Sequence, residues 1–233
     1  MAVPERGARA VIFDLWDTLV PLPARVRAAA VERMAQALEL LVANFREAWA
    51  ATWTRRATGP LEPIVDDIFR ELTGRSASEE QIANALRLRR EVHAPAFIPT
   101  AAAVETLCLL RAEGFRIGLL TNCTSDTPDL WRASVLALLA DAAAFSALEG
   151  VMKPEPSFYR LLLARLGVEP QGCAYIGDGK DDELEGAKRV GLAPNLYAPP
   201  GASSSWPGTT IRSLDEAPEL VRAMATNVLL RGT

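Results

Sequence analysis

From residue 97 onward, short apolar segments alternate with segments of helical periodicity. Strands are expected at residues 116–120, 143–146, 173–176 and 192–197, and helices at 101–113, 130–139, 156–166, 181–190 and 213–224. Nearly continuous apolar runs are typical of strands that are covered on both faces. Strand and helix in alternation are typical of a parallel sheet wrapped by helices. The pattern therefore predicts an α/β fold for this part of the chain.

Another strand is expected much earlier, at residues 10–13, and a long helical block separates it from the others. Between residues 21 and 96 the apolar side chains recur at helical spacing, and we find no strand signal. Ser78 and Gln81 have the spacing of a capping box, which predicts a helix start. We therefore expect a Rossmann-like core made of residues 1–20 and 97–233, with an all-helical domain inserted at 21–96.

Composition limits the kinds of protein that this chain can be. It has 233 residues, 49% of them hydrophobic, and a net charge of −4 without a clustered basic face, so we expect no nucleic-acid partner. No apolar run approaches the ~20 residues of a membrane span, and the first ten residues lack a signal-peptide core. The three cysteines are odd in number and lack metal-ligand spacing. We expect a cytoplasmic protein with reduced thiols and no membrane association.

Four short polar motifs stand out, at residues 13–19, 119–122, 153–154 and 176–183. The first, second and fourth lie at or just after an expected strand. Because ligands of open α/β sheets bind outside the carboxyl ends of the strands, the motifs are expected to meet in one crevice. In type and order they resemble the haloacid dehalogenase (HAD) superfamily of aspartate-nucleophile hydrolases. In that family, a helical insertion at this point is a cap that closes over the active site.

The resemblance implies roles for individual residues. Asp14 falls on the family's nucleophile, which forms a covalent intermediate that water resolves. Thr18 falls on the family's threonine. Thr121 and the neighbouring Asn122 are expected to bind a phosphoryl or carboxylate oxygen, and Lys153 to steady both the nucleophile and the substrate anion.

The first motif departs from the family's phosphatase pattern at Trp16. The family's second aspartate falls on this position, where it protonates the leaving group and later activates water; such help is worth ~10²–10⁴-fold in rate. Tryptophan cannot do this, and Asp17 can replace the missing acid only if the turn re-aims its side chain. Family dehalogenases also carry an aromatic residue here, because halide leaves without a proton.

The fourth motif favours phosphoryl chemistry. Further carboxylates beside Asp14 would repel it unless a cation lies between them, and hard oxygen ligands suit Mg²⁺. By resemblance the ligands are Asp14, the Trp16 backbone carbonyl and Asp178, with Asp182 as the first support and Glu183 next. Metal-independent dehalogenases of the family usually lack an acid at the Asp178 position.

Three functions are therefore weighed. We favour a Mg²⁺-dependent phosphatase that acts on a small phosphorylated metabolite. The alternative is a 2-haloacid dehalogenase that needs no metal, in which Lys153 and an early cap arginine such as Arg25 or Arg27 hold the substrate carboxylate. The third is a weakened family member that binds a ligand without turnover. In each case we expect a small-molecule partner and a monomer or homodimer.

Several other polar residues have structural interpretations. We interpret His93 as a solvated or capping residue, Cys123 as packing and Tyr159 as an ordinary apolar helix position. The cluster formed by Trp49, Trp53, Arg55 and Arg56 could place an indole and a guanidinium over a substrate anion, but we interpret it as a buried tryptophan pair with solvated arginines.

Overall fold

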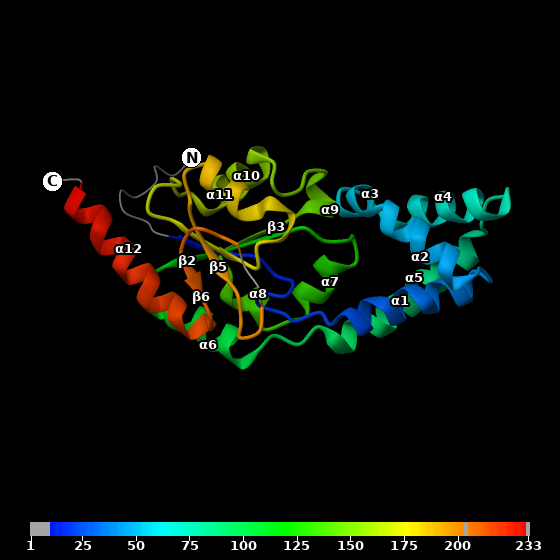
Figure 1. Ribbon diagram of the computed structural model, residues 1–233, viewed down its shortest axis with the longest axis horizontal. Helices are drawn as coiled ribbons and strands as arrows, with labels where there is room; N and C mark the ends of the chain where they lie inside the picture. Colours follow the sequence, from blue (N-terminus) through cyan, green and yellow to red (C-terminus); the bar gives the residue numbers. More distant parts are fainter. Residues whose placement is uncertain (1–9, 203–204, 232–233) are drawn as a thin grey trace.

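The computed structural model describes residues 10–202 and 205–231, and its core is one parallel sheet (Figure 1). The strands occur in the order β3-β2-β1-β4-β5-β6. They are β1 (Ala10–Phe13), β2 (Arg116–Thr121), β3 (Ala142–Phe145), β4 (Ala174–Gly177), β5 (Ala193–Tyr197) and β6 (Thr210–Ile211). The predicted α/β fold is confirmed.

Strand β1 lies in the middle of the sheet, between β2 and β4. Phe13 is in register with Leu119 on one side and with Ile176 on the other, and all four residues of β1 are buried. A strand that is covered on both faces has no solvent-exposed side on which polar residues are favoured, which explains its unbroken apolar sequence. Asp14 follows it directly and so lies at the centre of the carboxyl edge.

Two helical layers cover the sheet, and alternate β1 residues point into different cores. Val11 and Phe13 belong to the core under α6 (Ala101–Ala112), α8 (Leu136–Leu139) and α12 (Ala217–Arg231). Ile12 belongs to the core under α10 (Pro156–Leu166) and α11 (Glu183–Arg189).

The first five of the helices that follow β1 form a cap at one end of the molecule (Figure 1). They are α1 (Ala24–Ala37), α2 (Val42–Ala51), α3 (Trp53–Ala57), α4 (Leu61–Thr73) and α5 (Glu79–His93). The cap has a hydrophobic core of its own that includes Met34, Phe45 and Ile68. The capping box at the start of α5 is confirmed: Ser78 Oγ accepts from the Gln81 N–H, and Gln81 Oε1 accepts from the Ser78 N–H.

Some element boundaries differ from the sequence prediction. The helix expected at 130–139 is two helices, α7 (Thr127–Arg132) and α8, because the Ser134 N–H bonds to the Trp131 carbonyl and tightens the backbone. The helix expected at 181–190 begins at Glu183, after a single 3-10 turn, η2 (Lys180–Asp182). The remaining short elements are η1 (Ala94–Ala96), α9 (Ser146–Glu149) and η3 (Leu214–Glu216).

No helix of the described residues is long and apolar enough to cross a membrane alone. Only Glu79–Ala96 together with Ala101–Ala112 has the required length and composition, and these two segments are bent by 72° at their junction.

Candidate active site

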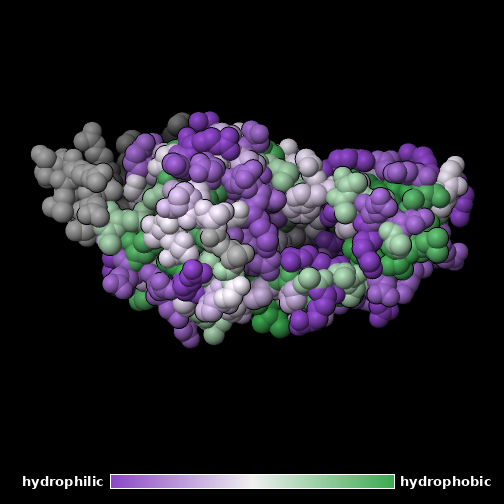
Figure 2. Space-filling view, viewed as in Figure 1, coloured by the Kyte–Doolittle hydropathy of each residue, from purple (hydrophilic) through white to green (hydrophobic). Residues whose placement is uncertain are grey.

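Asp14 lies at the floor of a cavity between the core and the cap. Its N–H donates to the Ile176 carbonyl at 2.9 Å, which continues the strand pairing one residue beyond β1. Its side chain is buried; one carboxylate oxygen accepts from Thr18 Oγ1 at 3.2 Å, and the other accepts from Lys153 Nζ at 2.5 Å. The cavity measures about 490 Å³. Figure 2 shows the recess between the two parts of the molecule.

Lys153 joins Asp14 to a second buried carboxylate, that of Glu183. Lys153 Nζ donates to Glu183 Oε2 at 2.5 Å and to the Tyr175 hydroxyl oxygen at 3.1 Å. The Tyr175 hydroxyl donates to the same Glu183 oxygen at 2.6 Å, and the Gly179 N–H donates to the other at 2.8 Å. Every Glu183 oxygen therefore has a partner, as a buried charge requires.

Burial and charge act in opposite directions on this cluster. Burial raises the pKa of Asp14 to about 7, although Lys153 pulls it down. The charges of Glu183 and Asp178 add to the rise. Burial would lower the pKa of Lys153, but the two carboxylates outweigh it and raise that pKa above its usual range. Lys153 is therefore a permanent cation, and Asp14 gains from any further positive charge.

Glycine at position 177 is required by the Glu183 side chain. A Cβ at Gly177 would lie 2.1 Å from Glu183 Oε1, far inside contact distance. Tyr159, which we interpreted as an ordinary apolar helix position, also helps to place Glu183, because its hydroxyl donates to the Glu183 carbonyl at 2.8 Å.

We expect Gly177→Ala to destabilise the protein by about 2–3 kcal/mol, because the methyl group must displace a buried, paired carboxylate. Urea denaturation measures this. Gly150→Ala is the control. Gly150 follows α9 and, unlike Gly177, has a positive φ of 69°, but a Cβ there meets nothing within 4 Å, so only the backbone cost of about 1 kcal/mol applies. Equal losses in both variants would contradict the role of Gly177.

Three carboxylates form a candidate cation site. Oxygens of Asp14, Asp178 and Glu183 lie within 4.8 Å of one another. Hard oxygen donors of this kind fit Mg²⁺. Glu183 is the most deeply buried of the three, at 1% exposed, so Asp14 and Asp178 are the more accessible ligands.

Asp182 does not belong to this cluster, in contrast to the sequence prediction. Asp181 and Asp182 both adopt left-handed backbone conformations, with φ of 53° and 52°. This turn leaves Asp182 exposed and outside the cavity lining, and it delivers Glu183 to the buried site instead. Asp178 lies where it was predicted, half-buried at the end of β4.

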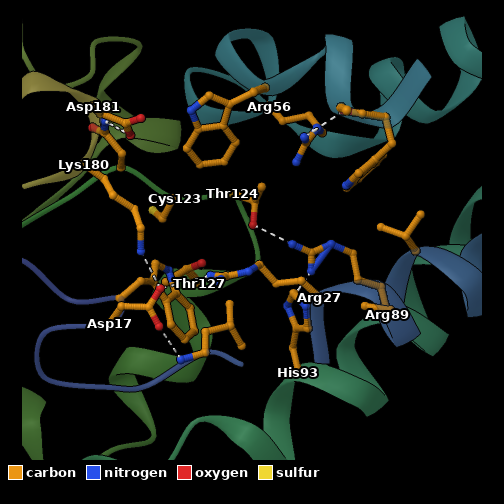
Figure 3. Close-up of a pocket in the computed structure, with 18 of the residues that line it drawn as sticks. Asp17, Arg27, Arg56, Arg89, His93, Cys123, Thr124, Thr127, Lys180 and Asp181 are labelled. Carbon is orange, nitrogen blue, oxygen red and sulfur yellow. Dashed lines mark hydrogen bonds and ion pairs between the residues drawn. The ribbon is translucent and has the colours of Figure 1, made fainter. Parts of the chain in front are cut away.

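Asp17 reaches the cavity because its backbone is also left-handed, with φ of 61°. Its carboxylate accepts from the Leu22 N–H at 2.9 Å, from Arg27 at 3.2 Å and from Lys180 Nζ at 2.8 Å (Figure 3). Partial burial opposes ionisation, but the hydrogen bonds from Lys180 and Leu22 outweigh it, so the pKa of Asp17 lies below its usual range. The turn thus re-aims the side chain, but it presents a carboxylate and not an acid. Trp16 lines the cavity and packs edge-on against Phe97, with ring centroids 5.3 Å apart.

The remaining predicted residues divide between the cavity and its support. Asn122 lines the cavity; its amide nitrogen donates to Asp181 at 2.9 Å, and its oxygen accepts from the Lys153 N–H at 2.8 Å. Thr121 is fully buried and does not line the cavity. Arg25 is exposed and also lies outside the lining, whereas Arg27, about 200° further round the same helix, is part of it.

The side chains that line the cavity but were not predicted as site residues include Lys180 and His93. Lys180 Nζ bridges Asp17 and Asp178, at 2.8 and 2.6 Å. His93 was interpreted as solvated or capping, but it is buried in the cavity wall. Burial and the neighbouring Arg89 lower the pKa of His93 to about 4, so its ring is neutral. Cys123 lines the cavity too, but burial raises the pKa of its thiol to about 12, which agrees with the packing role.

Comparison with known proteins places these features in a family. The model of a hydrolase family described as haloacid dehalogenase-like hydrolase matches residues 8–191. The chain is 32% identical over 211 residues to the phosphoglycolate phosphatase of Escherichia coli K12, covering 78% of each protein. It is 27% identical over 193 residues to the glyceraldehyde 3-phosphate phosphatase of Methanopyrus kandleri, covering 79% of this chain and 81% of the relative.

Solved structures show the same fold. A 2-haloacid dehalogenase from Pseudomonas syringae matches with a TM-score of 0.72 and 22% identity, over 93% of this chain and 98% of that one. The Bacillus subtilis protein YfnB, solved with bound magnesium, matches with a TM-score of 0.65 and 19% identity, over 92% and 98%.

Proposed function

Because the chain belongs to the haloacid dehalogenase-like hydrolase family, we propose that it is a Mg²⁺-dependent phosphatase of a small phosphorylated metabolite. The observation that carries this proposal is the cluster of Asp14, Asp178 and Glu183, whose oxygens lie within 4.8 Å of one another beside Lys153. Such a concentration of carboxylates suits a cation that also binds phosphate oxygens. The relatives named as phosphatases support the same reading.

In the proposed first step, Asp14 attacks phosphorus, the bond between phosphorus and the leaving-group oxygen breaks, and Asp14 becomes an aspartyl-phosphate. Lys153 holds the Asp14 carboxylate in place and offers positive charge to the transferring group, the main demand of phosphoryl transfer. Bound Mg²⁺, held by Asp14, Asp178 and Glu183, would supply further charge to the phosphate oxygens. Thr18 orients the second Asp14 oxygen.

In the second step, water attacks the aspartyl-phosphate, and Asp17 is proposed as the group that accepts its proton. Its depressed pKa makes Asp17 a carboxylate at neutral pH, able to accept a proton in this step but unable to donate one in the first. The leaving group therefore departs without a protein acid. Esters of acidic alcohols, such as phenols and enols, are the substrates that tolerate this.

We expect Asp17→Asn to slow the second step by roughly 10²-fold. The first step needs no proton from Asp17, so stopped-flow assays with 4-nitrophenyl phosphate should show a burst of nitrophenolate equal to the enzyme concentration, followed by slow turnover. Mg²⁺ affinity should stay nearly unchanged. Equal steady-state rates in wild type and variant would remove Asp17 from the mechanism.

The proposal as a whole is tested by phosphate release from a panel of small phosphoesters, with Mg²⁺ and with EDTA. Release that requires Mg²⁺ supports the phosphatase. A folded, Mg²⁺-binding protein that releases no phosphate from any ester would overturn it and would leave the dehalogenase or a ligand-binding role.

One observation favours a second candidate, a 2-haloacid dehalogenase. Trp16 lines the cavity at the position of the family's missing acid, and halide needs no proton to leave. In this reading Arg27, rather than Arg25, is the cap arginine placed to hold a substrate carboxylate. Halide release from 2-chloropropionate in EDTA, with no phosphatase activity, would favour it.

A further inference from the structure

Arg56 is a buried cation without a buried anion. Its side chain lies in α3, is 7% exposed and lines the cavity. Its Nη2 donates to the Trp49 carbonyl at 2.8 Å and its Nε donates to Thr52 Oγ1 at 3.1 Å. Its Nη1 makes no hydrogen bond, and no carboxylate pairs with it, anywhere in residues 10–202 and 205–231. A buried charge without an anionic partner is unfavourable, so this arrangement suits an anion from outside the protein.

The neighbouring charges cannot supply that anion. The acid whose charge acts on Arg56, Asp126, already accepts hydrogen bonds from Arg89 at 2.8 Å and from Thr124 Oγ1 at 2.6 Å. Burial and the positive charge of Arg89 lower the pKa of Arg56 to about 10, which still leaves it charged at neutral pH. The Trp49 carbonyl, in the last turn of α2, and the Thr52 hydroxyl oxygen offset the charge in part, but neither is an anion.

The wall around Arg56 is aromatic and apolar. Its guanidinium carbon lies 4.1 Å from the ring centroid of Trp49 and 5.5 Å from that of Trp53. Val31 and Met34 line the same wall. Arg46 adds a second guanidinium to the lining, exposed and without a carboxylate partner in the described residues.

Across the cavity lie Asp14, Lys153 and Asp178, where the phosphate is expected. Figure 3 places Arg56 on the cap side and Lys180 with Asp17 on the core side. A cavity of about 490 Å³ is in the range that holds whole ligands, well beyond a phosphoryl group alone.

We propose that the wall formed by Arg46, Trp49, Trp53 and Arg56 is a second anion site, which selects phosphate monoesters whose leaving group has an apolar, ring-sized body and carries a carboxylate or similar anion. This inference rests on the proposed phosphatase. The apolar body packs on the tryptophans, and the anion accepts a hydrogen bond from Nη1 of Arg56. A buried guanidinium with an unused donor discriminates between a charged and an uncharged group.

The test compares phenyl phosphate with 4-carboxyphenyl phosphate, two substrates that differ only in the second anion. We expect wild type to prefer the carboxylated ester at least tenfold in kcat/KM. Arg56→Met keeps the apolar stem over Trp49 and removes the charge, and it should reduce the preference to within about twofold. Intrinsic reactivity of each ester cancels when the variants are compared.

Arg55→Met is the matched control. Arg55 is the exposed neighbour on the same helix and pairs with Asp67 on the surface, so its removal should leave the preference intact. Arg56→Lys keeps a positive charge but loses the planar guanidinium group, so it should keep part of the preference that Arg56→Met loses. A wild-type preference near one, or a full preference in Arg56→Met, would overturn the second anion site while leaving the phosphatase in place.

A binding measurement separates this inference from the proposed reaction. Quenching of tryptophan fluorescence reports the affinity for phenylphosphonate and for 4-phosphonobenzoate, neither of which can be hydrolysed. Tighter binding of 4-phosphonobenzoate by wild type, lost in Arg56→Met and kept in Arg55→Met, supports the site even if no ester is turned over. Equal affinities for the two phosphonates overturn it.

Discussion

Asp14→Asn is expected to lower phosphate release by at least on the order of 10⁴-fold, because an amide oxygen is a poor nucleophile. The measurement is steady-state phosphate release at saturating Mg²⁺, with the aspartyl-phosphate of wild type trapped by acid quench. Loss of the trapped intermediate should accompany the loss of rate.

The fold of this variant is expected to be intact, which makes the result interpretable. Asparagine has nearly the shape of aspartate, and Lys153 remains paired with Glu183. Thr18→Val is a useful comparison, because it removes only the hydrogen bond to the second Asp14 oxygen and should cost far less. Substantial turnover by Asp14→Asn would mean that another group attacks phosphorus.

The position of Asp14 was predictable because it depends on local features of the sequence. The apolar run at residues 10–13 can only be a strand covered on both faces, and the residue after such a strand emerges at the ligand edge of the sheet. The helix at 156–166 was predicted with its true bounds, since a proline opens it and a glycine with φ of 64° ends it. Strong local signals and tertiary structure agree at these places.

The third carboxylate was not predictable in the same way. The sequence predicts a helix from residue 181, and the family resemblance put Asp182 first and Glu183 second as the supporting carboxylate. The observed left-handed turn at Asp181 and Asp182 starts the helix at Glu183. Aspartate tolerates this conformation, but nothing local requires it. What fixes the turn is the fit of Glu183 against Gly177, Lys153 and Tyr175, contacts that only the folded chain contains.

The cap shows a second limit of sequence interpretation. Arg55 and Arg56 are adjacent, yet one is exposed and paired with Asp67 while the other is buried over Trp49. Helix α3 has five residues, too few for periodicity to show which side faces the core. His93 is similar: it ends α5 and its burial arises from the packing of cap against core, where Arg89 donates to its Nδ1.

Lys153→Met is expected to destabilise the protein by about 3–5 kcal/mol when measured by urea denaturation in EDTA. The Lys153 side chain is 3% exposed and is the cation between two carboxylates that are themselves nearly inaccessible. Methionine fills the same space but leaves Asp14 and Glu183 facing each other without compensation. Activity should fall as well, since the nucleophile loses its anchor.

The loss should depend on pH, in a direction that follows from the pKa of Asp14. Burial already raises that pKa to about 7 with Lys153 present, and removing the lysine raises it further. An acid whose pKa is higher in the folded state than in the unfolded state binds its proton more tightly when folded. Its contribution to stability is therefore present at low pH and is lost as pH rises through the folded pKa. As the pH falls from 8 to 5, Lys153→Met should therefore gain more stability than wild type gains.

Lys180→Met is the matched control for this prediction, because Lys180 also bridges two carboxylates, Asp17 and Asp178. Its side chain is 63% exposed, so water screens both ion pairs and the expected loss is below about 1 kcal/mol. Similar losses in the two variants would mean that burial is not what makes Lys153 essential. Added Mg²⁺ should restore part of the stability of Lys153→Met, since a cation that binds only the folded carboxylate cluster shifts the equilibrium toward it. The same lysine thus makes a buried anionic nucleophile compatible with a stable fold.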